Sequence, residues 1–186
     1  MQVTRKLLIV AVALAVAAVV AIPALAAPGH KGHKGSAGPS KATLVIKGGT
    51  TFKINKFQKD SVRWVPGTVA IASGGTLTIR ASDPEPHTFS VVKHSQLPKT
   101  PDQIENCEVC NEIAKSHGVN PAEPPSGPPP ITTVDPGKDG FNEPGDSQVI
   151  EPHQTLKLTI TAKPGSKLYF ICAVHPWMQG VVKIVK

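Results

Sequence analysis

The sequence of 186 residues has only three cysteines and two methionines, and aromatic residues make up 4% of it. Three cysteines cannot form the dense disulfide network that stabilises small secreted scaffolds, so the fold needs an ordinary hydrophobic core. With 40% hydrophobic residues the chain has enough apolar side chains to build one. The length fits a single domain with appendages and excludes a multidomain redox enzyme.

Charged residues are absent from the N-terminal run Leu7 to Ile22. This run follows a basic start that ends at Lys6, and it precedes a small-x-small pattern that ends at Ala26, as in a signal peptidase site. We therefore predict a signal peptide over residues 1–26 and an extracytoplasmic protein, periplasmic or secreted. The run is close to the length of a membrane span, so an uncleaved anchor that tethers the protein to the membrane is the alternative.

Acidic and basic residues are unevenly distributed along the chain. The whole sequence has 20 basic and 13 acidic side chains, but residues 95–150 contain nine acidic residues and only three lysines. The rest of the exported chain is therefore strongly basic. Because the protein is predicted to be exported, we expect no nucleic-acid partner in spite of this charge.

The remainder divides into a short linker and a β-rich domain. Residues 27–41 are rich in glycine, lysine and histidine and predict a flexible tether. From residue 42 to 186 apolar and polar residues alternate in short segments separated by glycine and proline turns, which predicts an all-β fold, an antiparallel β-sandwich. The expected strands are Thr43–Lys47, Thr51–Phe57, Gly67–Ser73, Thr76–Ala81, His87–Val92, Thr155–Ala162, Leu168–Cys172 and Val181–Val185.

The insertion 95–150 interrupts this spacing and contains ten of the nineteen prolines. The sequence Thr100 to Gln103 has the form of a capping box with proline at the first helical position, and Gly118 supplies a stop signal. We predict one helix of about four turns between them. The Pro-rich remainder favours extended or turn conformations, so the insertion is expected to be an excursion from the sandwich and not a second core.

Residues that can bind a transition metal are concentrated near the C-terminus. A predicted strand delivers Cys172 into a tight loop that carries His175 and Met178, and His87 begins another strand far upstream. A thiolate, two imidazoles and a weak thioether suit copper that cycles between two oxidation states, because soft sulfur favours Cu(I) and imidazole binds either state. The sequence therefore predicts one copper site.

At these residues the chain resembles the cupredoxins, the small blue copper proteins, and its ligand loop is most similar to the short loop of amicyanin. The resemblance covers about residues 42–94 and 150–186, whereas the long insertion is a departure from the plastocyanin-like pattern. It implies a Greek-key β-sandwich with one type 1 copper ion. The implied ligands are His87, Cys172 and His175 in the equatorial plane, with Met178 axial. Other motifs that carry the resemblance are Pro66-Gly67, Gly74-Gly75, Pro86-His87-Thr88 and Pro164-Gly165.

A single copper site without further ligand sets implies an electron carrier and not an enzyme. Redox partner proteins, such as a cytochrome, a dehydrogenase or an oxidase, would dock transiently at an exposed edge of His175 beside Trp177. The alternative is a copper-handling protein for delivery, scavenging or resistance, in which His30 and His33 collect the metal.

The two remaining cysteines form the motif Cys107-Glu108-Val109-Cys110. A thioredoxin-type motif needs a βαβ context, and covalent haem needs histidine at position 111, which is asparagine. Because one of the three cysteines is assigned to copper, Cys107 and Cys110 are predicted to form a structural disulfide. Packed free thiols and an accessory metal or redox role are the alternatives. His117 is expected to interact with the dipole at the helix terminus.

Overall fold

The structure is a computed structural model that describes residues 38–123 and 127–186. The predicted signal peptide at 1–26 and residues 27–37 of the expected tether lie outside the described residues. Strand β1 begins at Lys41, the last residue of that tether. In the described part of the chain, no helix is long and apolar enough to cross a membrane.

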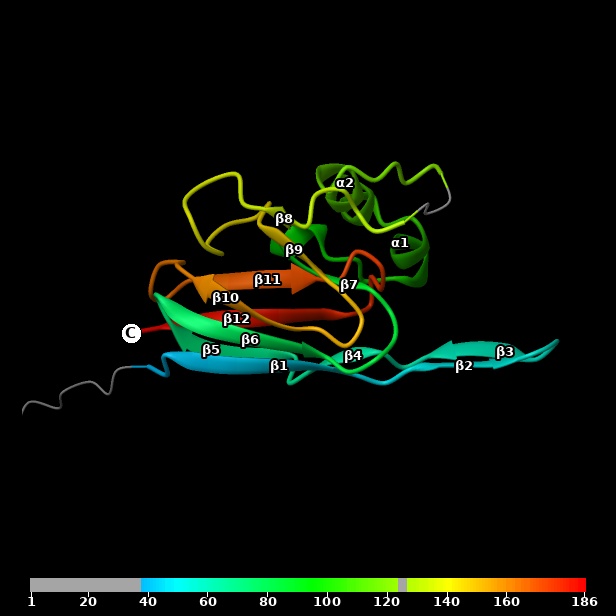
Figure 1. The fold of residues 1–186 in the computed structure, drawn as a ribbon, viewed down its shortest axis with the longest axis horizontal. Helices are drawn as coiled ribbons and strands as arrows, with labels where there is room; N and C mark the ends of the chain where they lie inside the picture. Colours follow the sequence, from blue (N-terminus) through cyan, green and yellow to red (C-terminus); the bar gives the residue numbers. More distant parts are fainter. Residues whose placement is uncertain (1–37, 124–126) are drawn as a thin grey trace, which may run out of the picture. The chain divides into compact units, whose positions relative to one another are not determined.

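Two β-sheets form a sandwich, so the predicted all-β fold is confirmed (Figure 1). Their connections pass repeatedly from one sheet to the other, as in Greek-key sandwiches. In spatial order, the first sheet contains β10 (Thr155–Ile160), β6 (Gly75–Ala81), β1 (Lys41–Lys47) and β4 (Arg63–Val65). The second contains β5 (Thr68–Ala72), β12 (Gln179–Val185), β11 (Lys167–Ile171), β7 (His87–Val92), β9 (Ser147–Ile150) and β8 (Thr133–Val134).

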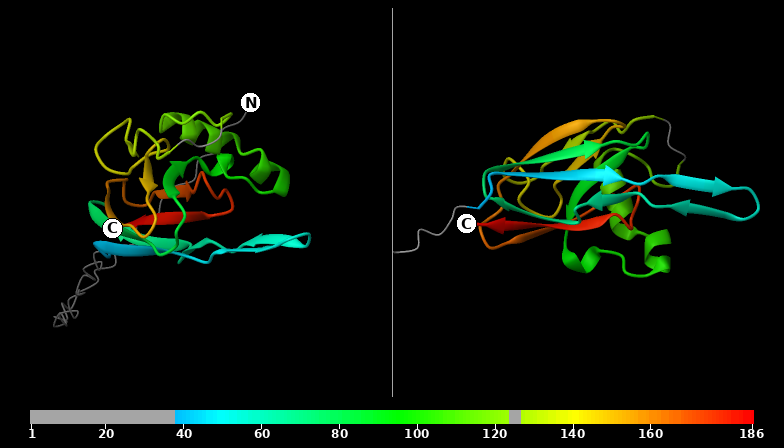
Figure 2. Two further views of the ribbon diagram at one scale, coloured as in Figure 1. Left: turned by 45° about the vertical axis from the view of Figure 1, so that its right-hand side comes forward. Right: turned by 90° about the horizontal axis from the view of Figure 1, so that it is seen from below.

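The strand prediction omits the short strands β4, β8 and β9 and is wrong in two further details. The sandwich is not purely antiparallel, because β1 pairs with β6 and β5 pairs with β12 in parallel. The expected single strand Thr51–Phe57 is instead a hairpin of β2 (Thr50–Lys53) and β3 (Phe57–Asp60), and it extends beyond the sandwich (Figure 2). Asn55 makes this reversal with a φ of 56°, a left-handed conformation that asparagine tolerates.

Four of the eight aromatic residues, Trp64, Phe89, Phe141 and Phe170, pack together in the core between the sheets. The Trp64 ring meets the Phe170 ring edge-on with centroids 5.4 Å apart, and Phe89 lies 4.6 Å from Phe170. The Trp64 indole N–H also donates to the Met178 carbonyl at 3.1 Å. The large side chains of the core therefore support the loop that was expected to bind metal.

The helical part of the insertion is broken into two α-helices, α1 (Pro101–Glu105) and α2 (Glu108–Ser116), after the short 3₁₀ helix η1 (His94–Gln96). Thr100 caps α1 as predicted, because its hydroxyl accepts from the Gln103 amide at 3.3 Å. The predicted continuous helix is interrupted at Cys107, which caps α2 and forms a disulfide with Cys110.

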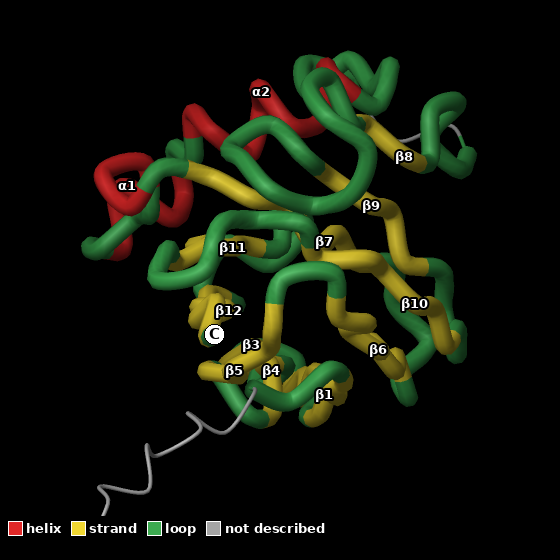
Figure 3. Tube along the Cα trace, turned by 90° about the vertical axis from the view of Figure 1, so that its left-hand side faces the viewer, coloured by secondary structure: helices red, strands yellow, loops and turns green. Residues whose placement is uncertain are grey.

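The insertion forms a packed layer with its own hydrophobic cluster, contrary to the expectation that it is an excursion from the sandwich and not a second core. It covers the outer side of the six-stranded sheet (Figure 3), where Ile113 and the disulfide pack against Val92 and Ile171. Farther along, Phe141 belongs to the main core and lies 5.7 Å from Phe89. Because the core covers one face of β7 and the insertion covers the other, all six residues of β7 are buried.

Asp146, just before β9, is a buried carboxylate with an incomplete set of partners. Its Oδ2 accepts from the amides of Asn142 and Glu143 at 2.7 and 2.9 Å, whereas Oδ1 has no hydrogen-bond partner among the described residues. Burial raises the pKa of Asp146. The ionised form therefore lowers the free energy of unfolding, by an amount that is absent below the unfolded pKa of about 3.9 and grows as pH rises through the native pKa.

We expect Asp146→Asn to be more stable than wild type at pH 7, because asparagine keeps an acceptor for both amides and removes the buried charge. The difference should disappear near pH 3.5, where wild-type Asp146 is protonated in both states. Urea unfolding at the two pH values measures this, with the exposed Asp139→Asn as control. A less stable Asp146→Asn protein at pH 7 would contradict the prediction.

Candidate metal centre

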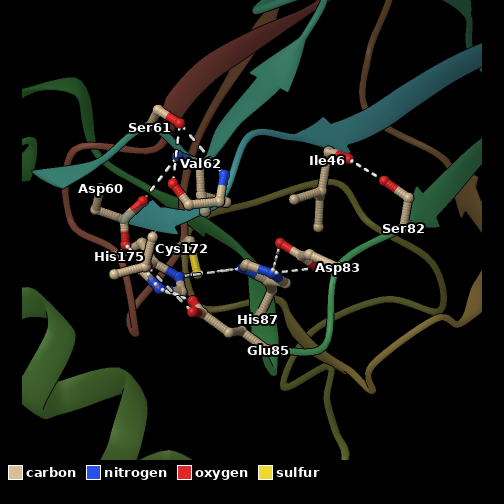
Figure 4. A network of polar contacts seen from close by, with 12 residues as sticks. Ile46, Asp60, Ser61, Val62, Ser82, Asp83, Glu85, His87, Cys172 and His175 are labelled. Atoms are coloured by element: carbon tan, nitrogen blue, oxygen red, sulfur yellow. Dashed lines mark hydrogen bonds and ion pairs between the residues drawn. The ribbon is translucent and has the colours of Figure 1, made fainter. Parts of the chain in front are cut away.

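Three of the four predicted ligands meet at one end of the sandwich. His87 begins β7 and Cys172 directly follows β11, and these two strands are antiparallel neighbours. His175 returns from the following loop. The Cys172 Sγ lies 3.7 Å from His87 Nδ1 and 3.8 Å from His175 Nδ1, and the two Nδ1 atoms are 3.2 Å apart (Figure 4).

The size of this triangle matches the coordination of one metal ion. A point equidistant from three atoms with these separations lies about 2.1 Å from each, which falls in the range of transition-metal bonds to imidazole nitrogen and thiolate sulfur, roughly 2.0–2.3 Å. The side chains therefore need little rearrangement to bind a single ion.

The ligand group is shielded from solvent. His87 and Cys172 are fully buried and His175 is 6% exposed. The edge of His175 that the sequence predicted to be exposed is therefore almost wholly covered by neighbouring side chains. Val174 and Trp177, on either side of it in the loop, are the exposed apolar residues.

Carboxylates fix the orientation of both imidazole rings. Both oxygens of Asp83 lie 3.0 Å from His87 Nε2, while Glu85 lies 2.8 Å and Asp60 3.8 Å from His175 Nε2. An ionised carboxylate only accepts, so Nε2 carries the proton in each ring and the Nδ1 lone pair is directed towards the sulfur.

Sequence reasoning missed these carboxylates, although composition held a signal. Outside the insertion 95–150 the chain has only four acidic residues, namely Asp60, Asp83, Glu85 and Glu151. Three of the four contact the ligand histidines. Acidic residues that are scarce in a basic domain and close in sequence to a predicted ligand are candidates for its hydrogen-bond partners.

Thr88 holds the sulfur ligand in place from the neighbouring strand. Its amide donates to Cys172 Sγ at 3.4 Å, and its hydroxyl accepts from the Ala173 amide at 2.8 Å. Burial raises the pKa of the Cys172 thiol, opposed by hydrogen bonds that include those from Thr88. Burial likewise lowers the pKa of His87, opposed by Asp83. A buried thiol and a neutral imidazole are a suitable pair for a cation, which takes the place of the thiol proton.

Met178 completes the short loop from the backbone side. Its amide donates to the His175 carbonyl at 2.8 Å, and its carbonyl accepts from the Cys172 amide at 3.0 Å. The side chain is buried. These bonds close the loop into a tight turn, which brings Met178 close to Cys172 and His175.

The donor set fits one type 1 copper ion. Two imidazoles and a thiolate in a triangle, with a weak thioether nearby, are the arrangement that proteins use for blue copper. The disulfide between Cys107 and Cys110 lies in the insertion and leaves Cys172 as the free cysteine of the described residues.

No family model and no curated protein sequence matches this chain. The chain is similar to solved cupredoxin structures. The purple cupredoxin from Nitrosopumilus maritimus is 13% identical, with 77% of this chain and 98% of that chain covered and a TM-score of 0.41. Reduced auracyanin from Roseiflexus castenholzii is 15% identical, with 79% and 98% covered and a TM-score of 0.41. Auracyanin A from Chloroflexus aurantiacus, a blue copper protein, is 19% identical, with 77% and 98% covered and a TM-score of 0.38.

We expect Asp83→Ala to weaken the affinity for Cu(II) by about 10- to 100-fold, because the released His87 ring loses its fixed orientation. Asp83→Asn retains an acceptor for Nε2 and should lose less. Competition with a chelator of known affinity measures both. The matched control is Glu151→Ala, the one acidic residue outside the insertion that does not contact the ligand histidines. Equal affinities of Asp83→Ala and wild type would contradict the role of Asp83.

Proposed function

We propose that this protein is an extracytoplasmic blue copper protein of the cupredoxin class that carries single electrons between redox partners. His87, Cys172 and His175 are the equatorial ligands and Met178 is the axial ligand. The observation that carries this proposal is the buried triangle of donor atoms, whose dimensions suit one ion. The predicted N-terminal signal peptide supports export, and an uncleaved signal would act as a membrane tether.

The bound ion supplies a reversible one-electron change between Cu(II) and Cu(I). The surrounding residues hold the donors in one geometry: Asp83 and Glu85 fix the rings, Thr88 fixes the sulfur, and Trp64 anchors the loop at Met178. Ligands held in this way move little when the charge changes. Small rearrangement favours fast electron transfer.

Burial of the ligands supports a carrier in preference to an enzyme or a copper-delivery protein. The three donors are almost inaccessible to solvent, so a substrate has no direct approach to them. Transfer of the ion itself to another protein would require the carboxylate-supported loop to open. The copper-handling alternative therefore predicts rapid exchange, which these contacts disfavour.

Electron transfer through a partner complex needs an exposed surface close to the buried ligands. Trp177 lies beside His175 with ring centroids 5.3 Å apart, and it is held by a hydrogen bond from its indole N–H to the Val62 carbonyl at 3.1 Å. Together with the exposed Val174 it forms an apolar surface next to the centre. We propose that redox proteins dock here through a small, transient interface.

Cys172→Ser should abolish the intense visible charge-transfer band of the Cu(II)-loaded protein while leaving the sandwich folded, because other residues supply most of the core. An absorption spectrum after full loading is the test. The double variant Cys107→Ser/Cys110→Ser removes the other two cysteines and should retain the band. A wild-type protein that loads fully without the band, and releases its copper rapidly to a chelator, would instead favour copper handling.

Met178→Leu should leave copper bound and raise the reduction potential, because the axial ligand tunes the potential and its loss leaves a lower coordination number, which Cu(I) accepts more readily than Cu(II). Potentiometric titration followed at the visible band measures the shift. Wild-type protein under the same conditions is the reference. Complete loss of copper from Met178→Leu would show that Met178 is an essential ligand and not a tuning one.

A further inference from the structure

A chain of hydrogen-bonded side chains connects the metal centre to the insertion. Ser90 Oγ donates to Thr88 Oγ1 at 2.9 Å and lies 2.6 Å from Ser147 Oγ. Ser147 Oγ in turn lies 2.7 Å from Nε2 of His117, whose Nδ1 is 2.6 Å from the Ile131 carbonyl oxygen. The chain starts at the residue that bonds Cys172 and ends at the C-terminal cap of α2.

The members of the chain are buried, which makes their polarity unusual. Ser90, Ser147 and His117 are each 1% exposed. Ser90 and Ser147 are directly paired between β7 and β9, on the face that the insertion covers. The same face buries Val92 two residues farther along β7, so apolar side chains fit this layer. Buried hydroxyls are costly unless every member is paired, and a fully paired network fixes a unique arrangement.

The direction of donation links the two ends. Each hydroxyl has one proton, so Ser90, which donates to Thr88, accepts from Ser147, and Ser147 in turn accepts from His117 Nε2. Because the Ile131 carbonyl can only accept from Nδ1, this direction of donation requires a proton on both nitrogens of His117. Ser90 donates to Thr88, which also accepts from the Ala173 amide. The Thr88 proton is therefore free to be directed at the sulfur, and the Thr88 side chain is among the groups that lower the pKa of Cys172 against burial. Removing the Ser90 hydroxyl takes this donor away from Thr88, and removing the Ser147 hydroxyl takes away the partner that fixes the direction of the Ser90 proton.

We propose that Ser90, Ser147 and His117 are positioning residues that act through Thr88 on the Cys172 sulfur, so that the insertion sets the reduction potential of the centre. This inference rests on the proposed function and adds a regulatory role for residues 95–150. Hydrogen bonds directed at the sulfur withdraw electron density from it, which favours the reduced state. Movement of α2 away from the sheet would break the chain at His117 and weaken that effect.

The test compares the reduction potentials of copper-loaded Ser90→Ala, Ser147→Ala and the double variant. We expect each single variant to lower the ratio of reduced to oxidised protein at a fixed ambient potential by about two- to tenfold, the equivalent of one net hydrogen bond. The double variant should shift no further than one single variant, because a chain needs to be cut only once. Ser147→Thr keeps the hydroxyl and should restore the wild-type ratio.

Two control variants separate the chain from general loosening of the insertion. Ser116→Ala removes a hydroxyl of helix α2, and this hydroxyl donates only to the Ile113 carbonyl. Ile113→Ala removes apolar packing under α2 and leaves every side chain of the hydrogen-bonded network in place. Both should leave the potential unchanged. Additive shifts in the double variant, an equal shift in Ile113→Ala, or unchanged potentials in the single variants would each overturn the inference.

A second measurement needs no metal. In copper-free protein, the exchange-protected imidazole N–H resonance of His117 should move in Ser90→Ala, although Ser90 does not contact His117, and should stay unchanged in Ser116→Ala. If the His117 resonance moves in Ser90→Ala but the protein never binds copper, the proposed function is overturned. The coupling between Ser90 and His117 would still stand. A blue protein in which the resonance and the potential both stay fixed would overturn this inference alone.

Discussion

The antiparallel pairing of β7 with β11 is the constraint on which the centre depends. It brings His87 and Cys172, 85 residues apart in sequence, to within 3.7 Å through their nitrogen and sulfur atoms. Thr88 connects the same two strands beyond the end of their ladder, since it bonds both Cys172 and Ala173. The loop that follows Cys172 returns His175 to the same point within three residues. The positions of His87 and Cys172 are therefore set by the register in which β7 pairs with β11.

The carboxylates extend this constraint to the other sheet and to the hairpin. Asp83 and Glu85 come from the connection between β6 and β7, and Asp60 ends β3. The Thr50 hydroxyl lies within hydrogen-bond distance of both Glu85 and Asp60, at 3.2 and 3.0 Å. The base of the β2–β3 hairpin is therefore joined to the partners of His175. The few acidic residues of the basic sandwich thus orient the imidazole rings. A carboxylate that accepts from one ring nitrogen determines that the other nitrogen binds the metal.

The insertion changes the environment of the sheet that carries the ligands. In a two-layer sandwich β7 and β11 would expose their outer faces to water, but here Ile113, Val92 and the disulfide form a second apolar cluster over them. This third layer excludes solvent from the backbone around Cys172. It also explains why Ser90 and Ser147 are buried with no loss of hydrogen bonding, because His117 completes their network.

Local sequence determined most of the longer strands, the turns between them, the Thr100 cap and the ligand types, because alternation, glycine turns and donor chemistry are properties of neighbouring residues. The spacing of Cys172, His175 and Met178 was informative for the same reason. The helix break at Cys107, the parallel strand pairs and the hairpin at Asn55 depend on what each segment packs against, which alternation does not encode. Tertiary structure alone placed Asp83, Glu85 and His117 in the network of the centre. Glu85 and His117 act through contacts between segments distant in sequence, whereas Asp83 contacts His87 from four residues away. Even the nearby contact could not be predicted, because a carboxylate has no local pattern that distinguishes a solvated side chain from a buried partner.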